Sequence, residues 1–218
     1  MNTPSSEDLK QTLEDFGKVQ GSALVVGGMA VIHYGYERST KDIDALYAYA
    51  DSDILERLKP NFKLTRKSPI GWHHLEHRKT GVRLELIPEG VLGTYGFIPG
   101  PKAVGGENGF ISLYGLVWLK LISWRLNDRA DLDILAKART SEFAALREKL
   151  HPEMLERFDE IIAGAKRDME FDPHGAIDTL RKGIGSERVE EAPAPYAKKK
   201  RAARTKRKTE KTPAQSGK

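Results

Sequence analysis

The stretch from Leu24 to Leu46 restricts the fold of this chain more than any other part of its sequence. An apolar run, Ala23 to Val26, ends at the pair Gly27-Gly28, and the apolar residues that follow recur at helical spacing. The pattern predicts a strand that turns sharply into a short helix, which Gly35 closes. After a polar link, a second strand is expected to open at Asp42.

The second strand begins with the order Asp42-Ile43-Asp44-Ala45. Residues two apart in a strand point to the same face. The carboxylates of Asp42 and Asp44 are therefore expected side by side, with Ile43 and Ala45 toward the core. Two close carboxylates raise each other's pKa and oppose folding unless a cation lies between them. Mg²⁺ accepts such oxygen pairs and then holds substrate phosphates, so the pattern predicts a divalent metal site.

A strand, a Gly-Gly turn, a helix and then Arg38-x-Thr40-x-Asp42-x-Asp44 occur here in order. This arrangement resembles the nucleotidyltransferase superfamily with the DNA polymerase β type of catalytic core. It is most similar to the bacterial branch that contains abortive-infection and toxin-antitoxin nucleotidyltransferases. Many members carry Gly-Ser where this chain has Gly27-Gly28, so the serine hydroxyl that touches a phosphate is absent here.

A second block supports the same resemblance. The run from Leu113 to about Asn127 is apolar nearly all round and predicts a buried helix with Lys120 in its middle. A buried ammonium needs an anion. Lys120 is expected either to reach a nucleotide triphosphate, or to pair with Asp131 or extend to solvent for structural reasons. The family's second block is a Lys followed by an Arg and a spaced Asp pair, which matches Lys120, Arg125, Asp128 and Asp131-Leu132.

Glu85 is the candidate third acidic residue. It lies in the apolar strand pattern from Val82 to Ile87, where an isolated carboxylate is costly unless it is paired or bound to a metal. In the family, an acidic residue on a later strand completes the metal site, and it is usually Asp. The alternative for Glu85 is a pair with Arg83 or with a lysine on a neighbouring strand.

The resemblance, which extends to about Leu135, implies a metal-dependent enzyme that transfers NMP from an NTP to an acceptor hydroxyl of RNA, such as tRNA, or of protein. The implied cofactor is Mg²⁺, or Mn²⁺ in its place. The residues implied as catalytic are Asp42, Asp44, Glu85 and Lys120, of which the three acids bind metal. The residues implied in nucleotide binding are Gly27, Gly28, Arg38, Thr40, Lys120 and Asp131.

Two other functions stay open. One is a catalytically silent protein with the nucleotidyltransferase fold that binds nucleic acid or acts as an antitoxin. The intact Asp42 and Asp44 pair argues against it, because two repelling carboxylates bring no benefit without a metal. The other is a small-molecule nucleotidyltransferase that modifies antibiotics. A zinc site at His73, His74 and His77 is disfavoured, because the spacing supplies no fourth ligand.

The rest of the pattern predicts an α+β fold with a mixed sheet. The expected parts are a nucleotidyltransferase core at 1–112, a helical C-terminal part at 113–187 and a disordered basic tail at 188–218. The glycine-rich stretch from Pro88 to Gly109 is expected either to cover a site or merely to connect elements. Further strands are expected at 62–65, 72–78 and 82–87, and further helices at 5–16, 52–59, 130–138, 141–150, 152–167 and 175–182.

Charge is distributed unevenly along the 218 residues. From Pro193 onward the chain carries ten basic residues and the single acid Glu210, whereas the whole chain has a net charge of only +5. The tail is therefore a candidate contact for RNA or DNA. An NTP and a cognate antitoxin protein are the other expected partners. The absence of cysteine excludes disulfides and cysteine-ligated metals. The chain has no membrane-length apolar run and no signal-peptide pattern at its start, so a cytoplasmic protein is expected.

Overall fold

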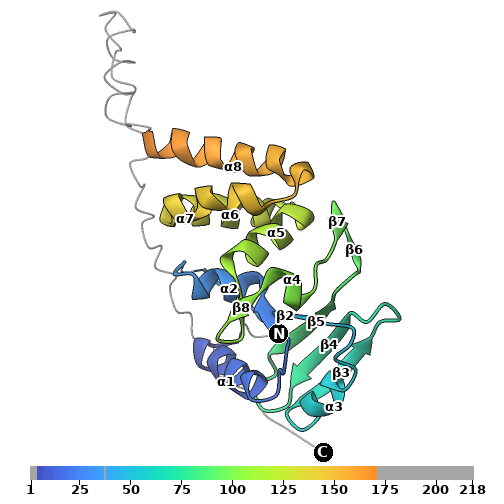
Figure 1. Cartoon of the computed structure of the whole chain (residues 1–218). Coiled ribbons are helices and arrows are strands. Elements are labelled where there is room, and N and C mark those ends of the chain that lie inside the picture. The colour runs from blue at the N-terminus through green and yellow to red at the C-terminus, as the bar shows by residue number, and fades with distance from the viewer. Residues whose placement is uncertain (1–3, 37, 171–218) are drawn as a thin grey trace, which may run out of the picture. The chain divides into compact units, whose positions relative to one another are not determined.

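A mixed seven-stranded sheet forms the centre of the fold in the computed structural model, which describes residues 4–36 and 38–170 (Figure 1). Its strand order is β3-β4-β5-β2-β1-β9-β8. The pairs β2–β5 and β1–β9 are parallel, and the other neighbours are antiparallel. The strands are β1 (Leu24–Val26), β2 (Asp42–Tyr47), β3 (Phe62–Lys67), β4 (His73–His77), β5 (Arg83–Pro88), β8 (Gly106–Glu107) and β9 (Phe110–Ile111). Two short strands, β6 (Leu92–Gly93) and β7 (Gly96–Phe97), form a separate hairpin.

Eight α-helices accompany the sheet within the described residues, so the predicted α+β class with a mixed sheet is confirmed. No helix in residues 4–36 or 38–170 has the length and apolar character needed to span a membrane. The helices are α1 (Ser6–Gly17), α2 (Gly27–His33), α3 (Ile54–Leu58), α4 (Pro101–Val104), α5 (Leu113–Ser123), α6 (Leu126–Ala138), α7 (Thr140–Ala145) and α8 (Pro152–Glu170), with a 3₁₀ turn at Leu146–Lys149.

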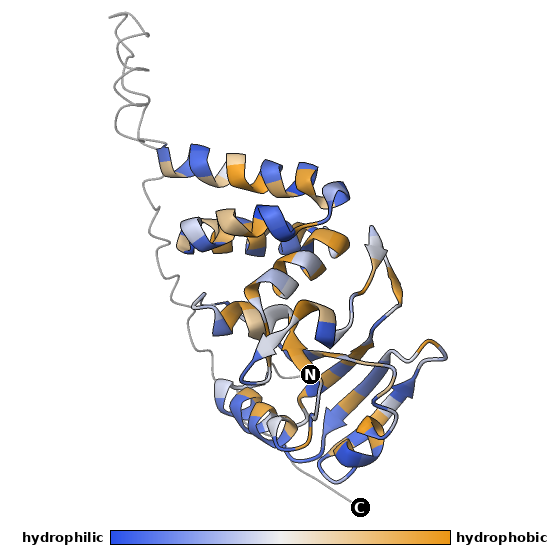
Figure 2. Ribbon diagram, viewed as in Figure 1, coloured by the Kyte–Doolittle hydropathy of each residue, from blue (hydrophilic) through white to orange (hydrophobic). Residues whose placement is uncertain are grey.

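The sheet separates two apolar cores. On one face, strands β1 to β5 pack with α1 and α3 around buried side chains such as Phe16, Leu58 and Phe62. On the other face, α2 and α5 to α8 pack over β1, β2 and β9 around side chains such as Val117 and Phe158. Figure 2 shows apolar residues of α8 alternating with polar ones along the helix. The helical layer thus shares its core with the sheet.

Strand β2 contributes to both cores because its side chains alternate. Ile43 and Ala45 are fully buried in the core under α1 and α3, as predicted. Leu46 is fully buried in the opposite core. Asp42 and Asp44 share the face of Leu46 by the two-residue period of a strand, and they stand toward the beginning of β2. The two carboxylates therefore lie on the face of the sheet that α2 and α5 to α8 cover.

Local capping signals fix the start of two helices. The Ser5 and Asp8 side chains form a capping box at α1, as the sequence predicts. The Ser112 hydroxyl accepts a hydrogen bond from the Gly115 amide and starts α5 where it is expected. The helix α3, by contrast, begins after Asp53 without a side-chain cap.

One expected element differs in the structure. The α5 helix ends at Ser123, four residues early, because Trp124 adopts a left-handed backbone conformation, and α6 then starts at Leu126. The glycine-rich stretch after Pro88 contains the β6–β7 hairpin, α4 and β8. The predicted helix at 175–182 and the basic tail lie outside the described residues.

Candidate functional site

A cleft of about 420 Å³ lies between the sheet and α5. Its polar end is lined by Gly27 at the end of β1, Asp44 on β2, Glu85 on β5 and Lys120 on α5. The elements that carry these side chains are neighbours in the sheet or pack on it. The cleft therefore gathers four of the residues that the sequence singles out.

Strand register places the acidic residues. Asp44 is paired across the sheet with Val26 on one side and with Glu85 on the other. Asp42 is one row further along β2, opposite Arg83, and the two rows lie on the same face. The prediction that Glu85 accompanies the two aspartates is thus supported by a direct cross-strand position.

The Asp44 carboxylate is the most strongly perturbed acid of the site. Its burial in the cleft, together with the negative charges of Asp42 and Glu85, raises the pKa of Asp44 to about 7. The positive charges of Arg125 and Lys120 only partly oppose this shift. A cation close to Asp44 would stabilise its ionised form, because the positive charge offsets the repulsion by Asp42 and Glu85.

Gly27 is required by the position of Asp44. Its φ of 60° lies in the left-handed region, and a Cβ built there would stand 2.0 Å from the Asp44 Oδ2 atom. The space at Gly27 is therefore taken by the carboxylate of β2. The structure fills the space beside the Gly27 backbone with the chain's own acid.

Gly28 has a similar relation to Thr40. A Cβ at Gly28 would lie 2.9 Å from the Thr40 Oγ1 atom, so any larger residue needs a shift of Thr40. The Thr40 hydroxyl donates to the Asp42 backbone carbonyl at 3.1 Å and lies 3.4 Å from the Asp42 carboxylate. Thr40 thus supports the turn before β2 and occupies the volume next to the absent serine side chain.

Glu85 has a different partner from the one expected. The predicted alternative, an ion pair with Arg83, is wrong because Arg83 points to Asp42, at 3.7 Å, and not to Glu85. The Glu85 Oε1 atom lies 3.4 Å from Nδ1 of His74 on the adjacent strand β4. Both side chains remain partly exposed, so Glu85 keeps oxygen atoms that face the cleft opening.

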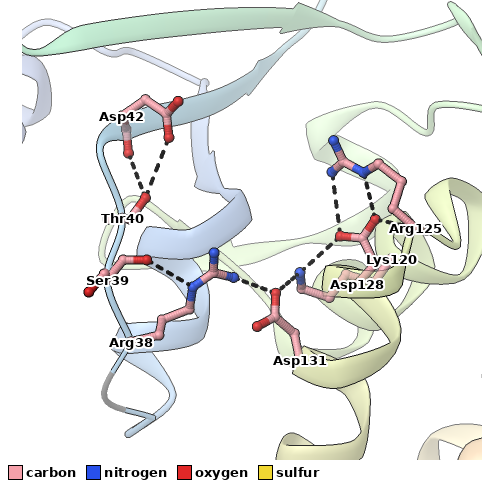
Figure 3. A network of polar contacts seen from close by, with 8 residues as sticks. All are labelled: Arg38, Ser39, Thr40, Asp42, Lys120, Arg125, Asp128 and Asp131. Atoms are coloured by element: carbon pink, nitrogen blue, oxygen red, sulfur yellow. Dashed lines mark hydrogen bonds and ion pairs between the residues drawn. The ribbon is translucent and has the colours of Figure 1, made fainter. Parts of the chain in front are cut away.

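Lys120 takes part in a buried ion-pair network (Figure 3). Its Nζ atom donates to Asp131 at 2.6 Å and to Asp128 at 3.3 Å, and all three side chains are at most 7% exposed. The pairing alternative for Lys120 is therefore the one that the structure shows. Asp131 belongs to α6 and reaches Lys120 across the break at Trp124.

Two arginines complete the network from opposite sides. Arg38, from the segment before β2, donates to Asp131 at 2.5 Å and so connects that segment to α6. Arg125, at the start of α6, donates to Asp128 at 2.8 Å. Burial opposes ionisation of Asp128, but Arg125 and Lys120 together hold the pKa of Asp128 below its usual value. Three cations and two carboxylates leave the network with one net positive charge.

Arg125 is the cation that faces the cleft. Its side chain is 77% exposed although it is bonded to Asp128, and it lines the cleft together with Lys120. Sequence reasoning names Arg125 in the second block without giving it a role. Its position at the N-cap of α6, directly after the left-handed Trp124, is what directs it into the cleft. That helix break has no clear signal in the sequence.

The predicted site residues thus fall into two groups. Gly27, Asp44, Glu85 and Lys120 line the cleft itself. Gly28, Arg38, Thr40, Asp42 and Asp131 form its support: they hold the turn, the start of β2 and the buried ends of the cations.

The carboxylates fit a hard divalent cation of the Mg²⁺ type. Within residues 4–36 and 38–170, no group of three or more His, Asp or Glu side chains is arranged as a ready metal cage. Mg²⁺ usually binds through one or two carboxylates, with waters and substrate phosphates as its remaining ligands. Asp44 and Glu85, with Asp42 in the next row, supply oxygen ligands of that kind.

Two of the three histidines of β4, His73 and His77, are buried in the core. His77 is buried beside Asp15 and Thr80, and His73 is buried against Tyr47 with no hydrogen-bond partner at Nδ1. Both alternate with His74, which points to the opposite face of the sheet. The three imidazoles therefore do not share one site, and this arrangement argues against a zinc site formed by them.

No protein-family model matches this chain, and no curated protein matches it. The resemblance to nucleotidyltransferases is therefore argued from the residues themselves and from their arrangement.

Proposed function

We propose that the protein is a metal-dependent nucleotidyltransferase, which transfers NMP from an NTP to an acceptor hydroxyl of RNA or protein. The observation that carries this proposal is the pair Asp44 and Glu85 in one row of the sheet, at the polar end of a cleft that Arg125 lines from α6. A cleft that joins clustered carboxylates to an exposed guanidinium suits a ligand with both phosphates and a bound cation.

Asp42, Asp44 and Glu85 are the residues that would hold Mg²⁺. When bound, the ion supplies charge neutralisation for the triphosphate and for the departing pyrophosphate. Gly27 contributes by leaving room for Asp44 at the strand end, which fixes the carboxylate in the cleft. Thr40 keeps the start of β2 in place through its bond to the Asp42 carbonyl.

Arg125 binds the phosphates in this proposal. Its guanidinium uses Nε and Nη2 to hold Asp128, so that Nη1 stays available for an anionic ligand. Lys120 acts behind it as a positioning residue, because its ammonium fixes both Asp128 and Asp131. Arg38 joins the same network through Asp131, so the substrate side of β2 and the helical layer are held in one geometry.

The proposal is tested by incubating the protein with each α-labelled NTP, Mg²⁺ and cell lysate. Label is expected in RNA or in protein, and it should be lost with Asp44→Asn. A control variant, Asp53→Asn, changes an exposed acid remote from the cleft and should keep full activity. Label that appears only in small molecules would redirect the proposal to the antibiotic-modifying class. If no NTP gives transfer, the catalytically silent nucleic-acid-binding alternative replaces it.

A further inference from the structure

The cleft has an apolar end that the phosphate chemistry does not use. On the face that carries Asp44, the next row of the sheet contains Leu46 and Ile87, about 7 Å further along the strands. Leu116 and Ile122 of α5 also line the cleft. The cleft is thus amphipathic along its length, with carboxylates and cations at one end and aliphatic side chains at the other.

The β6–β7 hairpin closes this apolar end. The Tyr95 amide at its turn donates to the Ile122 carbonyl at the end of α5, at 3.1 Å. A Cβ at Gly93 would lie 2.7 Å from the Ile122 side chain, so the hairpin packs directly on α5. The guanidinium of Arg157 on α8 lies over the Tyr95 ring, at 3.5 Å from its centre. Figure 1 shows the hairpin reaching from the sheet toward the helical layer.

Apolar side chains at this end remain open to solvent. Leu92 lines the cleft with a residue exposure of 68%, and its cross-strand partner Phe97 is 67% exposed. Trp72, just before β4, lines the cleft and is only partly buried. A planar aromatic ring beside an exposed aliphatic side chain is a suitable surface for a flat, uncharged ring system.

We propose that the apolar end is the nucleobase subsite, where the base of the NTP packs against Trp72 and the β6–β7 hairpin. This inference rests on the proposed function and adds the residues that hold the base. The direction follows from charge: the triphosphate needs the Arg125 end, so the uncharged base is left with the aliphatic end. Because stacking on an aromatic ring tolerates any base, purines should bind more tightly than pyrimidines through their larger stacked area.

The test compares two probes, Mg²⁺-ATP and Mg²⁺-tripolyphosphate, by isothermal titration with the full chain. Tripolyphosphate has the charged part of the ligand without the base. Trp72→Leu is expected to weaken ATP binding roughly tenfold, the scale of one lost base-aromatic stack, and to leave tripolyphosphate binding unchanged. Trp72→Phe should restore most of the ATP affinity. Leu92→Asn, at an exposed position, should act in the same direction with little effect on folding.

A matched control is Ile70→Asn. Ile70 is 51% exposed in the same segment as Trp72 but is not part of the cleft, so both affinities should stay as in the wild type. Equal losses for ATP and tripolyphosphate in Trp72→Leu, or unchanged ATP affinity in both Trp72→Leu and Leu92→Asn, would overturn the base subsite while leaving the proposed function intact. Wild-type protein that binds neither probe would instead refute the proposed function itself.

Discussion

Asp44 is the side chain of the site whose ionisation is most opposed by burial and by neighbouring negative charges. It is paired across the sheet with Val26 and with Glu85. Among the described residues, no group donates a hydrogen bond to its carboxylate. The free energy of its ionisation is therefore the quantity that a bound cation would change most. Substitutions at Asp44 and around it separate the contribution to folding from the contribution to function.

The first prediction concerns the pH dependence of folding. The pKa of Asp44 is about 7 in the folded protein and 3.8 for an ordinary aspartate, so the folded state holds the proton more tightly. The free energy of unfolding should therefore fall as pH rises from about 4 to about 7, by an amount on the order of a few kcal/mol. Asp44→Asn should remove this decrease. Urea unfolding from pH 4 to pH 8 checks it, and parallel curves for the two proteins would contradict it.

The second prediction concerns the metal. Without Mg²⁺, Asp44→Asn should be as stable as the wild type at neutral pH, or more stable, because repulsion by Asp42 and Glu85 is relieved. With Mg²⁺ and NTP at a hundredfold excess over Kd, the wild type should gain about 2.7 kcal/mol and the variant should not. Paired melts with and without Mg²⁺-NTP measure the reversal. Asp42→Asn serves as the second variant, and a wild type without any Mg²⁺-dependent shift would refute the metal site.

The third prediction separates backbone strain from contact at Gly27. Both Gly27 and Gly35 have positive φ, but only at Gly27 would a Cβ meet another group, the Asp44 carboxylate. Gly35→Ala should lose about 1 kcal/mol from the left-handed backbone alone. Gly27→Ala should lose more stability and also the response to Mg²⁺, because Asp44 must move. Thermal melts of both variants decide this, and equal losses with an intact Mg²⁺ response would argue against the contact.

Among the elements, β1, α2 and β2 are well predicted from sequence because their signals are local. The two-residue period of β2, the Gly-Gly turn and the Ser112 cap each act within a few residues. The break after α5 is not predictable in this way, since Trp124 has a positive φ without being glycine. Helical spacing predicts that Lys120 meets Asp131, and they do meet, but across two helices joined at an angle rather than along one.

The apolar end of the cleft could not be predicted for a related reason. The path of the glycine-rich stretch depends on contacts of Tyr95 with α5 and α8, which are distant in the sequence. Nothing in the residues around Trp72 indicates that it would lie opposite a hairpin formed twenty residues later. The charged part of the site follows strand periodicity, whereas the apolar part follows tertiary packing.

The fourth prediction tests the ion pairs that Lys120 of α5 forms with Asp128 and Asp131 of α6. Lys120→Met keeps the length of the side chain, and each carboxylate keeps one arginine, since Asp128 stays with Arg125 and Asp131 with Arg38. The fold should therefore survive with a modest loss, smaller than the 3–5 kcal/mol typical when a buried charge loses its only partner. NTP affinity should fall because Arg125 loses its fixed support. A stable variant with normal turnover would remove Lys120 from the site.

At the scale of the whole molecule, charge is divided between the body and the C-terminal end of the sequence. The ten basic residues from Lys198 to Lys218 lie outside the described residues, so their contribution is argued from the sequence alone. The rest of the chain is mildly acidic by formal charge, with a net value of −4. A nucleic-acid acceptor would therefore find its main electrostatic attraction in the basic stretch.

The fifth prediction follows from this division. Deleting Pro193 to Lys218 should leave the melting temperature nearly unchanged and should weaken the binding of RNA or DNA. If the basic stretch contacts about five phosphates, the salt dependence of duplex binding should lose a log-log slope of roughly 0.9 per contact. Fluorescence anisotropy at several salt concentrations measures the slope. Unchanged affinity in the truncated protein would show that the basic stretch is an inert, solubilising segment.

The pairing of β1 with β9 has a consequence for synthesis of the chain. Val25 is bonded on one side to β2 and on the other to the segment around Gly109 and Phe110, 85 residues later. At roughly 5–20 residues per second, a ribosome needs on the order of ten seconds to add those residues. During that time β1 has an open edge, to which a neighbouring nascent chain can add a strand. Polysome crowding and early chaperone contact should therefore affect the yield of this protein before the residues that line the cleft are all synthesised.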